Sequence, residues 1–90
     1  MKTRDILPRK FTFDEEGLKL LAKRLKEIHA DKGLTQEELA YRAELTLFQI
    51  ARIETIKTNP TISTLFQIIR TLEISPSELF NFELSKNSKE

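Results

Sequence analysis

The sequence lacks cysteine and tryptophan, and its 90 residues include only one histidine, two glycines and three prolines. Without cysteine the chain can form neither disulfides nor thiolate metal sites, so a reducing compartment is its natural setting. His29 alone cannot build a metal site. We therefore expect no metal and no other cofactor.

Long apolar runs are also missing. The longest uncharged run extends from Thr58 to Ile69, contains Pro60 and is well short of the roughly 20 apolar residues that a membrane span needs. No apolar segment follows the N-terminal charges as it would in a signal peptide. We expect a cytoplasmic protein that does not contact a membrane, with a length that suits one small domain.

Three capping boxes mark the starts of short helices. In each box the side chain of a Thr or Ser at the N-cap accepts a hydrogen bond from the backbone amide three residues later. The Glu or Gln at that later position accepts in return from the backbone amide of the N-cap residue. The pairs are Thr35 with Glu38, Thr46 with Gln49, and Ser75 with Glu78. Pro76 supports the third start, because proline is favoured at the first helical position. These boxes predict a helix from Gln36 to Ala43, another over about 46–54, and a third from Pro76.

Apolar spacing predicts two further helices. The first is capped by Asp14 and stops at Gly33, and the second follows Asn59 and Pro60. Their apolar stripes are Leu18, Leu21, Ala22, Leu25 and Ile28 in the first, and Ile62, Leu65, Ile68, Ile69 and Leu72 in the second. The predicted fold is therefore all-α, a compact five-helix bundle in which the helices over 36–43 and 46–54 form a helix-turn-helix.

Charge and polarity divide the chain into three parts. The net charge is only +1, but the N-terminal arm, residues 1–13, has an excess of basic residues. These are Lys2, Arg4, Arg9 and Lys10. Residues 14–82 form the predicted helix-turn-helix domain and residues 83–90 a polar tail. The arm either follows the DNA backbone or enters the minor groove, or it is a disordered solubilising tail.

The helix over 46–54 has two distinct faces. At about 100° per residue, Ile50, Ile53 and Glu54 share the inward side. The other side carries Leu47, Phe48, Ala51 and Arg52. Arg52 can bond to guanine with two N–H groups, while the three apolar side chains can contact thymine methyl groups. The alternatives are that Arg52 is an ordinary surface residue and that Leu47 and Phe48 pack on a partner protein.

The sequence resembles the phage-repressor and Cro-like helix-turn-helix family, also called the xenobiotic-response-element type, over about residues 14–80. The resemblance rests on LTQEELA, IARIE, the step from Asn59 to Pro60, and ISPSELF. It implies a five-helix bundle that forms homodimers and places the helix over 46–54 in the DNA major groove. It also implies contacts to the DNA backbone, which we expect from Gln36, Thr46, Lys57, Thr58 and Asn59.

Three residues depart from this family where glycine is common. They are Glu44, Ile56 and Glu73, each at a place where a left-handed backbone is usual. A β-branched residue tolerates positive φ worst. Ile56 therefore suggests that the connection after the helix over 46–54 is rebuilt, which would disturb the contacts expected from Lys57, Thr58 and Asn59.

A second set of apolar residues lies near the C-terminus. Phe80, Phe82 and Leu84 alternate like a short strand, as do Phe11 and Phe13. We predict a two-fold homodimer interface formed by Leu79, Phe80, Phe82 and Leu84, in which the two extended pieces can pair. The alternative is that these side chains cap their own bundle.

Two polar residues fall on inward stripes. His29 continues the stripe of the first helix, and Glu54 continues that of the helix over 46–54. In the resembling family an Arg at the first position commonly pairs with a Glu at the second. We therefore predict that His29 contacts Glu54, since an unpaired inward carboxylate is costly. The alternative is that His29 points to solvent and Glu54 bonds elsewhere.

Together these features indicate a sequence-specific DNA-binding transcriptional regulator that acts as a homodimer. The alternative is an antitoxin or another protein-interaction module of the same fold, with Leu47 and Phe48 or Phe80 and Phe82 covering a protein partner. No pair of nucleophile and base and no cluster of metal ligands is visible, so we expect no catalytic residues and no enzyme activity.

Overall fold

The computed structural model describes residues 12–86, and within that range it contains five α-helices and no strand. In chain order these are α1 (Glu15–Asp31), α2 (Gln36–Ala43), α3 (Leu47–Glu54), α4 (Ile62–Leu72) and α5 (Pro76–Leu79). The predicted all-α bundle is confirmed. None of these helices is long and apolar enough to cross a membrane.

The helix starts follow the predicted caps. Asp14 accepts a hydrogen bond of 3.0 Å from the Gly17 amide at the start of α1. Both halves of each capping box are present at α2, α3 and α5, where the N-caps are Thr35, Thr46 and Ser75. The start of α4 is capped by Thr61. Because the caps satisfy backbone donors locally, short helices can begin within a few residues of one another.

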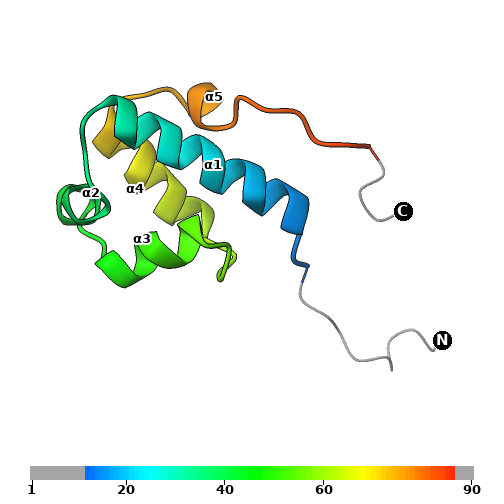
Figure 1. Cartoon of the computed structure of the whole chain (residues 1–90), viewed down its shortest axis with the longest axis horizontal. Coiled ribbons are helices and arrows are strands. Elements are labelled where there is room, and N and C mark those ends of the chain that lie inside the picture. The colour runs from blue at the N-terminus through cyan, green and yellow to red at the C-terminus, as the bar shows by residue number, and fades with distance from the viewer. Residues whose placement is uncertain (1–11, 87–90) are drawn as a thin grey trace.

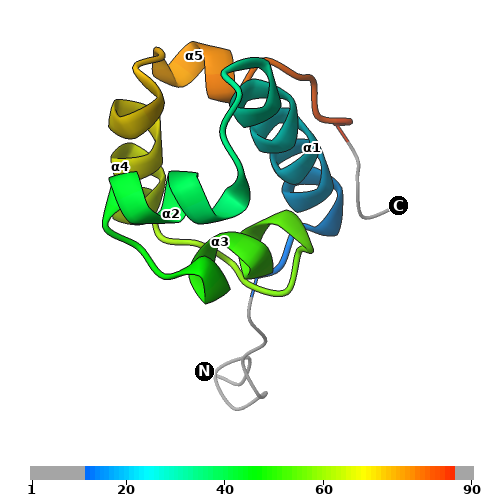
Figure 2. The same cartoon turned by 60° about the vertical axis from the view of Figure 1, so that its left-hand side comes forward.

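The helices surround one apolar core. Figure 2 shows α2 and α3 between α4 and α1, with α5 at the end opposite α3. Figure 1 shows the chain after α5 running beside α1. The side chains buried most deeply come from all five helices: Leu25, Leu39, Ile50, Ile68, Leu72 and Leu79. This arrangement holds α3 at one edge of the bundle, where one of its sides remains open.

One predicted core residue lies outside the core. Ile62 was expected to be buried with the rest of its stripe, but its side chain is 60% exposed. Ile62 occupies the first position of α4, beyond the reach of the core. It lines an open groove together with Leu18, Phe80 and Leu84. The prediction was wrong because apolar spacing cannot show where a helix leaves the core.

The connections after three helices use a left-handed residue that is not glycine. Glu44, Ile56 and Glu73 have φ angles of 60°, 53° and 58°. The expectation that the connection at Ile56 is rebuilt is therefore wrong. Its conformation is retained because two successive amides close the end of α3: Ile56 N–H donates to Ile53 and Lys57 N–H donates to Arg52, over 3.2 and 2.8 Å.

The segment after α5 is not the predicted strand. The Phe82 amide donates to the Phe80 carbonyl over 2.9 Å, so the chain turns where alternation had suggested an extended piece. Ser85 then donates to Glu16 of α1 through both its amide and its hydroxyl. Phe11, the rest of the arm before residue 12 and residues 87–90 lie outside the described range, so only the extended piece predicted before α1 stays a prediction.

Candidate nucleic-acid interface

The two sides of α3 have the burial that its spacing predicts. Ile50, Ile53 and Glu54 are buried. On the other side Leu47 is exposed, Phe48 is 67% exposed, and Ala51 and Arg52 are half-buried. Phe48 is a large apolar ring with little cover from its own chain. This side of α3 therefore offers an apolar surface that includes one cationic group.

Arg52 is held from two directions. Its guanidinium carbon lies 5.2 Å from the centre of the Phe48 ring, one helical turn earlier. Its Nη2 donates a hydrogen bond of 2.8 Å to the Lys57 carbonyl. The Lys57 amide in turn donates to the Arg52 carbonyl over 2.8 Å. Arg52 and Lys57 thus bond to each other twice, across the left-handed turn at Ile56.

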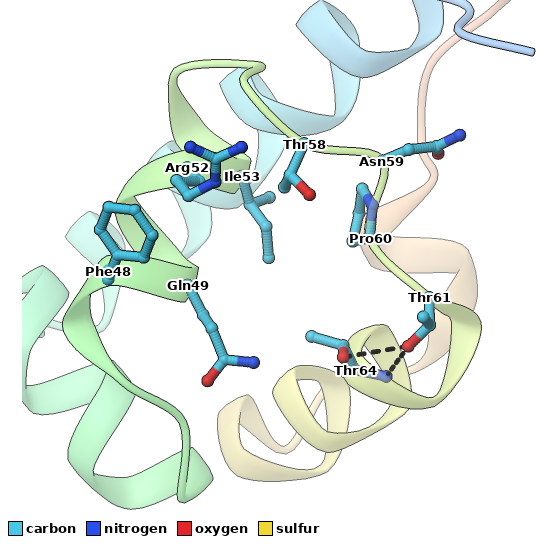
Figure 3. Close-up of a pocket in the computed structure, with 9 residues that line it drawn as sticks. All are labelled: Phe48, Gln49, Arg52, Ile53, Thr58, Asn59, Pro60, Thr61 and Thr64. Carbon is cyan, nitrogen blue, oxygen red and sulfur yellow. Dashed lines mark hydrogen bonds between the residues drawn. The ribbon is translucent and has the colours of Figure 1, made fainter. Parts of the chain in front are cut away.

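Arg52 and Phe48 line a hollow of about 260 Å³ between α3 and the start of α4 (Figure 3). Two residues predicted to contact the DNA backbone, Thr58 and Asn59, line it as well. The hollow therefore brings predicted base-reading residues together with predicted backbone-contacting residues.

Three polar residues of this hollow escaped the sequence analysis as site residues. Gln49 lines it from α3, and Thr61 and Thr64 line it from the start of α4. The Thr61 hydroxyl accepts from the Thr64 amide over 3.1 Å and donates to the Thr64 hydroxyl over 3.0 Å. Thr61 itself was the available signal, because a threonine directly before an apolar stripe is a preferred N-cap and marks a helix start beside the predicted contacts.

Asn59 also connects the hollow to the beginning of the described chain. Its amide nitrogen donates a hydrogen bond of 2.9 Å to the Thr12 carbonyl. The basic residues of the arm, from Lys2 to Lys10, precede Thr12 in the sequence. The arm therefore joins the domain next to the hollow, while Lys57 is exposed on the connection before it.

Gln36 and Leu47 line a second hollow of about 280 Å³ at the starts of α2 and α3. Gln36 is half-buried, and its Nε2 donates a hydrogen bond of 2.8 Å to Glu54 Oε1. Thr46 uses its hydroxyl to accept from the Gln49 amide over 3.0 Å. Of the predicted backbone contacts, Gln36, Thr46 and Asn59 thus already have side-chain hydrogen bonds within the protein.

The predicted contact between His29 and Glu54 is confirmed. His29 Nε2 lies 2.7 Å from Glu54 Oε2, and His29 Nδ1 lies 2.8 Å from the Leu34 carbonyl oxygen. Both side chains are buried. With the bond from Gln36, the Glu54 carboxylate joins residues of α1, α2 and α3. No buried side-chain N or O atom of the described residues lacks a hydrogen-bond partner.

The predicted dimer residues separate into two groups. Phe80 and Leu84 are exposed and Phe82 is half-buried, and all three line the apolar groove of about 280 Å³ that Ile62 also lines. Leu79 is 0% exposed and belongs to the protein's own core. Its inclusion in an interface was wrong, because a side chain enclosed by its own bundle cannot contact a second copy.

Comparisons with known proteins agree with this geometry. A model of the helix-turn-helix family HTH_3 matches residues 21–79. The HTH-type transcriptional regulator PuuR of Escherichia coli strain K12 is 40% identical over 67 residues, which are 74% of this chain and 36% of PuuR. The chain thus spans about a third of that relative. The uncharacterized HTH-type transcriptional regulator y4dJ of Sinorhizobium fredii is 33% identical over 61 residues, covering 68% of this chain and 79% of y4dJ.

The structure is also similar to the restriction-modification controller protein C.Esp1396I. The wild-type protein has a TM-score of 0.68 and 35% identity, with 79% of this chain and 88% of that chain covered. A single-residue variant of C.Esp1396I, bound to its highest-affinity operator site, has a TM-score of 0.66 and 35% identity, with 79% and 90% covered.

Proposed function

The chain belongs to the HTH_3 helix-turn-helix family, and on that premise we propose that it is a sequence-specific DNA-binding transcriptional regulator whose helix α3 reads the major groove. The observation that carries this proposal is the open side of α3, where Arg52 lies among exposed apolar side chains. The operator-bound relative supports DNA as the ligand. Because HTH_3 is a family of DNA-binding regulators and not a class of enzymes, we propose no catalytic role.

We assign base reading to four residues of α3. Arg52 donates to the O6 and N7 atoms of a guanine, because the guanidinium presents two N–H groups side by side. Leu47, Phe48 and Ala51 contact thymine methyl groups, which are the apolar feature of the major groove. The exposure of Leu47 and Phe48 supports these roles, since both side chains gain cover when α3 enters the groove.

Contacts to the DNA backbone flank this helix. We assign them to Gln36 and Thr46 on one side, and to Lys57, Thr58 and Asn59 on the other. The two hollows support the division, because each contains base-reading and backbone-contacting residues. Such contacts set the position of the protein on the duplex without reading sequence. The Gln36 Nε2 atom keeps its bond to Glu54 and donates its second N–H to a phosphate oxygen.

The regulator acts as a two-fold homodimer in this proposal. The interface comprises Phe80, Phe82 and Leu84, with Ile62 added from the exposed start of α4. These side chains form one apolar groove over α1, α4 and the segment after α5. A second copy that buries this groove places two α3 helices on the same side of the DNA, so the bound site has two related halves.

Selection of bound duplexes from a random DNA pool tests the proposal. We expect recovery of a palindromic site, with half-sites about one helical turn apart. The matched control is the Arg52→Ala variant, which should recover the same site poorly or with relaxed preference at one base pair. Recovery of no common site would contradict the proposal and favour a protein-interaction module instead.

A further inference from the structure

Phe48 and Arg52 behave as one unit on the surface of α3. They are four residues apart, so they project from the same side of the helix. The separation of 5.2 Å between the guanidinium carbon and the ring centre is a cation–π contact. Because the ring is 67% exposed, the free face of the pair is open to a ligand.

The hydrogen bond to the Lys57 carbonyl also restricts the position of the Arg52 guanidinium. The position of this carbonyl follows from the left-handed turn at Ile56, which brings Lys57 back over the last turn of α3. One hydrogen bond to this carbonyl uses one of the five guanidinium N–H donors. Among the described residues no carboxylate lies within ion-pair distance of Arg52. The other donors therefore remain for a ligand.

The separation of the pair is less than two base-pair steps along the duplex. Residues four apart on a helix differ by about 6 Å along its axis, and the observed contact brings the two side-chain ends within 5.2 Å. Successive base pairs are about 3.4 Å apart. Two groups this close, held against each other, meet neighbouring base pairs and not pairs several steps apart.

We propose that Phe48 and Arg52 together read two adjacent base pairs, one G·C and one T·A, with Arg52 bonded to the guanine and Phe48 packed on the thymine methyl. The turn at Ile56 and the Lys57 carbonyl are positioning elements that hold the guanidinium for this contact. The inference rests on the proposed function, since it requires that α3 bind duplex DNA. It goes further in stating that the two readings are energetically coupled.

Base analogues in the selected duplex measure the coupling. Deoxyuridine in place of the thymine removes the methyl group, and 7-deazaguanine in place of the guanine removes one acceptor of Arg52. For the wild type we expect the dissociation constant to rise about fourfold with deoxyuridine and about tenfold with 7-deazaguanine. Fluorescence anisotropy at one fixed salt concentration measures both effects. Each is expressed as the ratio of the dissociation constant for the analogue duplex to that for the unmodified duplex, called the deoxyuridine ratio and the 7-deazaguanine ratio.

Substitutions of Phe48 separate its two roles. Phe48→Tyr keeps the ring and should keep both ratios. Phe48→Leu keeps an apolar contact for the methyl group but removes the ring, so the deoxyuridine ratio should persist while the 7-deazaguanine ratio falls at least threefold. Leu47→Ala is the matched control, because Leu47 is exposed on the same helix and is not in the contact with Arg52. It should weaken binding without changing the 7-deazaguanine ratio.

Three results would overturn the inference. If the 7-deazaguanine ratio of Phe48→Leu equalled that of the wild type, Arg52 would read guanine without help from the Phe48 ring. A selected site in which no thymine neighbours the contacted guanine would contradict joint reading while leaving the proposed function intact. Selection of no site at all would contradict the proposed function, and the inference would fall with it. Circular dichroism confirms that each variant is folded before it is scored.

Discussion

The Nε2 atom of His29 lies 2.7 Å from the Oε2 atom of Glu54, inside the bundle. The other ring nitrogen of His29 faces the Leu34 carbonyl, which can only accept, so Nδ1 carries a proton and donates it. The second carboxylate oxygen of Glu54 accepts from Gln36. This polar chain fixes α3 to α1 and α2, and thereby sets how α3 is presented to DNA.

Removing the imidazole tests the strength of this contact. His29→Ala leaves the Glu54 carboxylate buried without its partner on α1, and we expect the free energy of unfolding to fall by about 3 kcal/mol. Urea denaturation followed by circular dichroism measures this value. Lys26→Ala, an exposed position on the same helix, should change stability by less than about 0.5 kcal/mol.

The double variant shows whether the loss comes from the pair itself. In His29→Ala combined with Glu54→Ala no carboxylate remains unpaired, so the combined loss should be smaller than the sum of the two single losses. Strict additivity would contradict a direct interaction between His29 and Glu54.

Local patterns predicted much of this fold because they act within one or two helical turns. Thr35, Thr46 and Ser75 each satisfy a backbone donor three residues away, so the caps can be read from the sequence alone. The inward placement of Glu54 followed from helix periodicity in the same way. These features need no knowledge of the tertiary structure.

The features that were missed depend on backbone geometry at the end of α3 or on packing between helices. Ile56 adopts positive φ because two hydrogen bonds at the end of α3 and one from Arg52 outweigh its steric cost. The preference of β-branched residues for negative φ had suggested instead that this connection is rebuilt. Leu79 was assigned to an interface although it is buried, because apolar character does not distinguish a core from a surface that needs cover. The hydrogen bond of Arg52 with the Lys57 carbonyl likewise depends on the path of the connection.

Replacing the left-handed residue after α4 by glycine should stabilise the protein. Glu73 is exposed and has a φ of 58°, a conformation that costs an L-residue about 1 kcal/mol or more and costs glycine little. Glu73→Gly should therefore raise the free energy of unfolding by about 1 kcal/mol. Glu27→Gly is the control: the same change within α1 should lower it by about 1 kcal/mol. A lower free energy of unfolding in Glu73→Gly than in the wild type would contradict the steric cost assigned to the left-handed conformation of Glu73.

The apolar groove should control oligomeric state. Phe80 is exposed in the single chain, and Phe80→Ser removes a large apolar side chain from the proposed interface. We expect its dimer dissociation constant to rise about tenfold or more, measured by sedimentation velocity over a range of concentrations. Tyr41→Ser is the control, because Tyr41 is 85% exposed on α2, away from the groove. Equal dissociation constants for the two variants would place the interface elsewhere.

The basic arm should contribute to the salt dependence of DNA binding. Its four cations precede the segment that Asn59 ties to the hollow beside α3. Deleting residues 1–10 should weaken binding and reduce the slope of log affinity against log salt by about 0.9 for each phosphate that the arm neutralises. Fluorescence anisotropy at several salt concentrations measures this slope. If the slope were unchanged, the arm would have no part in binding.

The central claim is that the open side of α3 contacts DNA, and backbone amide chemical shifts measured during titration with the selected duplex test it most directly. The account predicts the largest shifts at Leu47, Phe48, Ala51 and Arg52, with smaller shifts at Gln36 and from Lys57 to Asn59. It predicts little change at the amides of α5. Shifts concentrated on another surface, with α3 unchanged in the presence of bound DNA, would contradict the account.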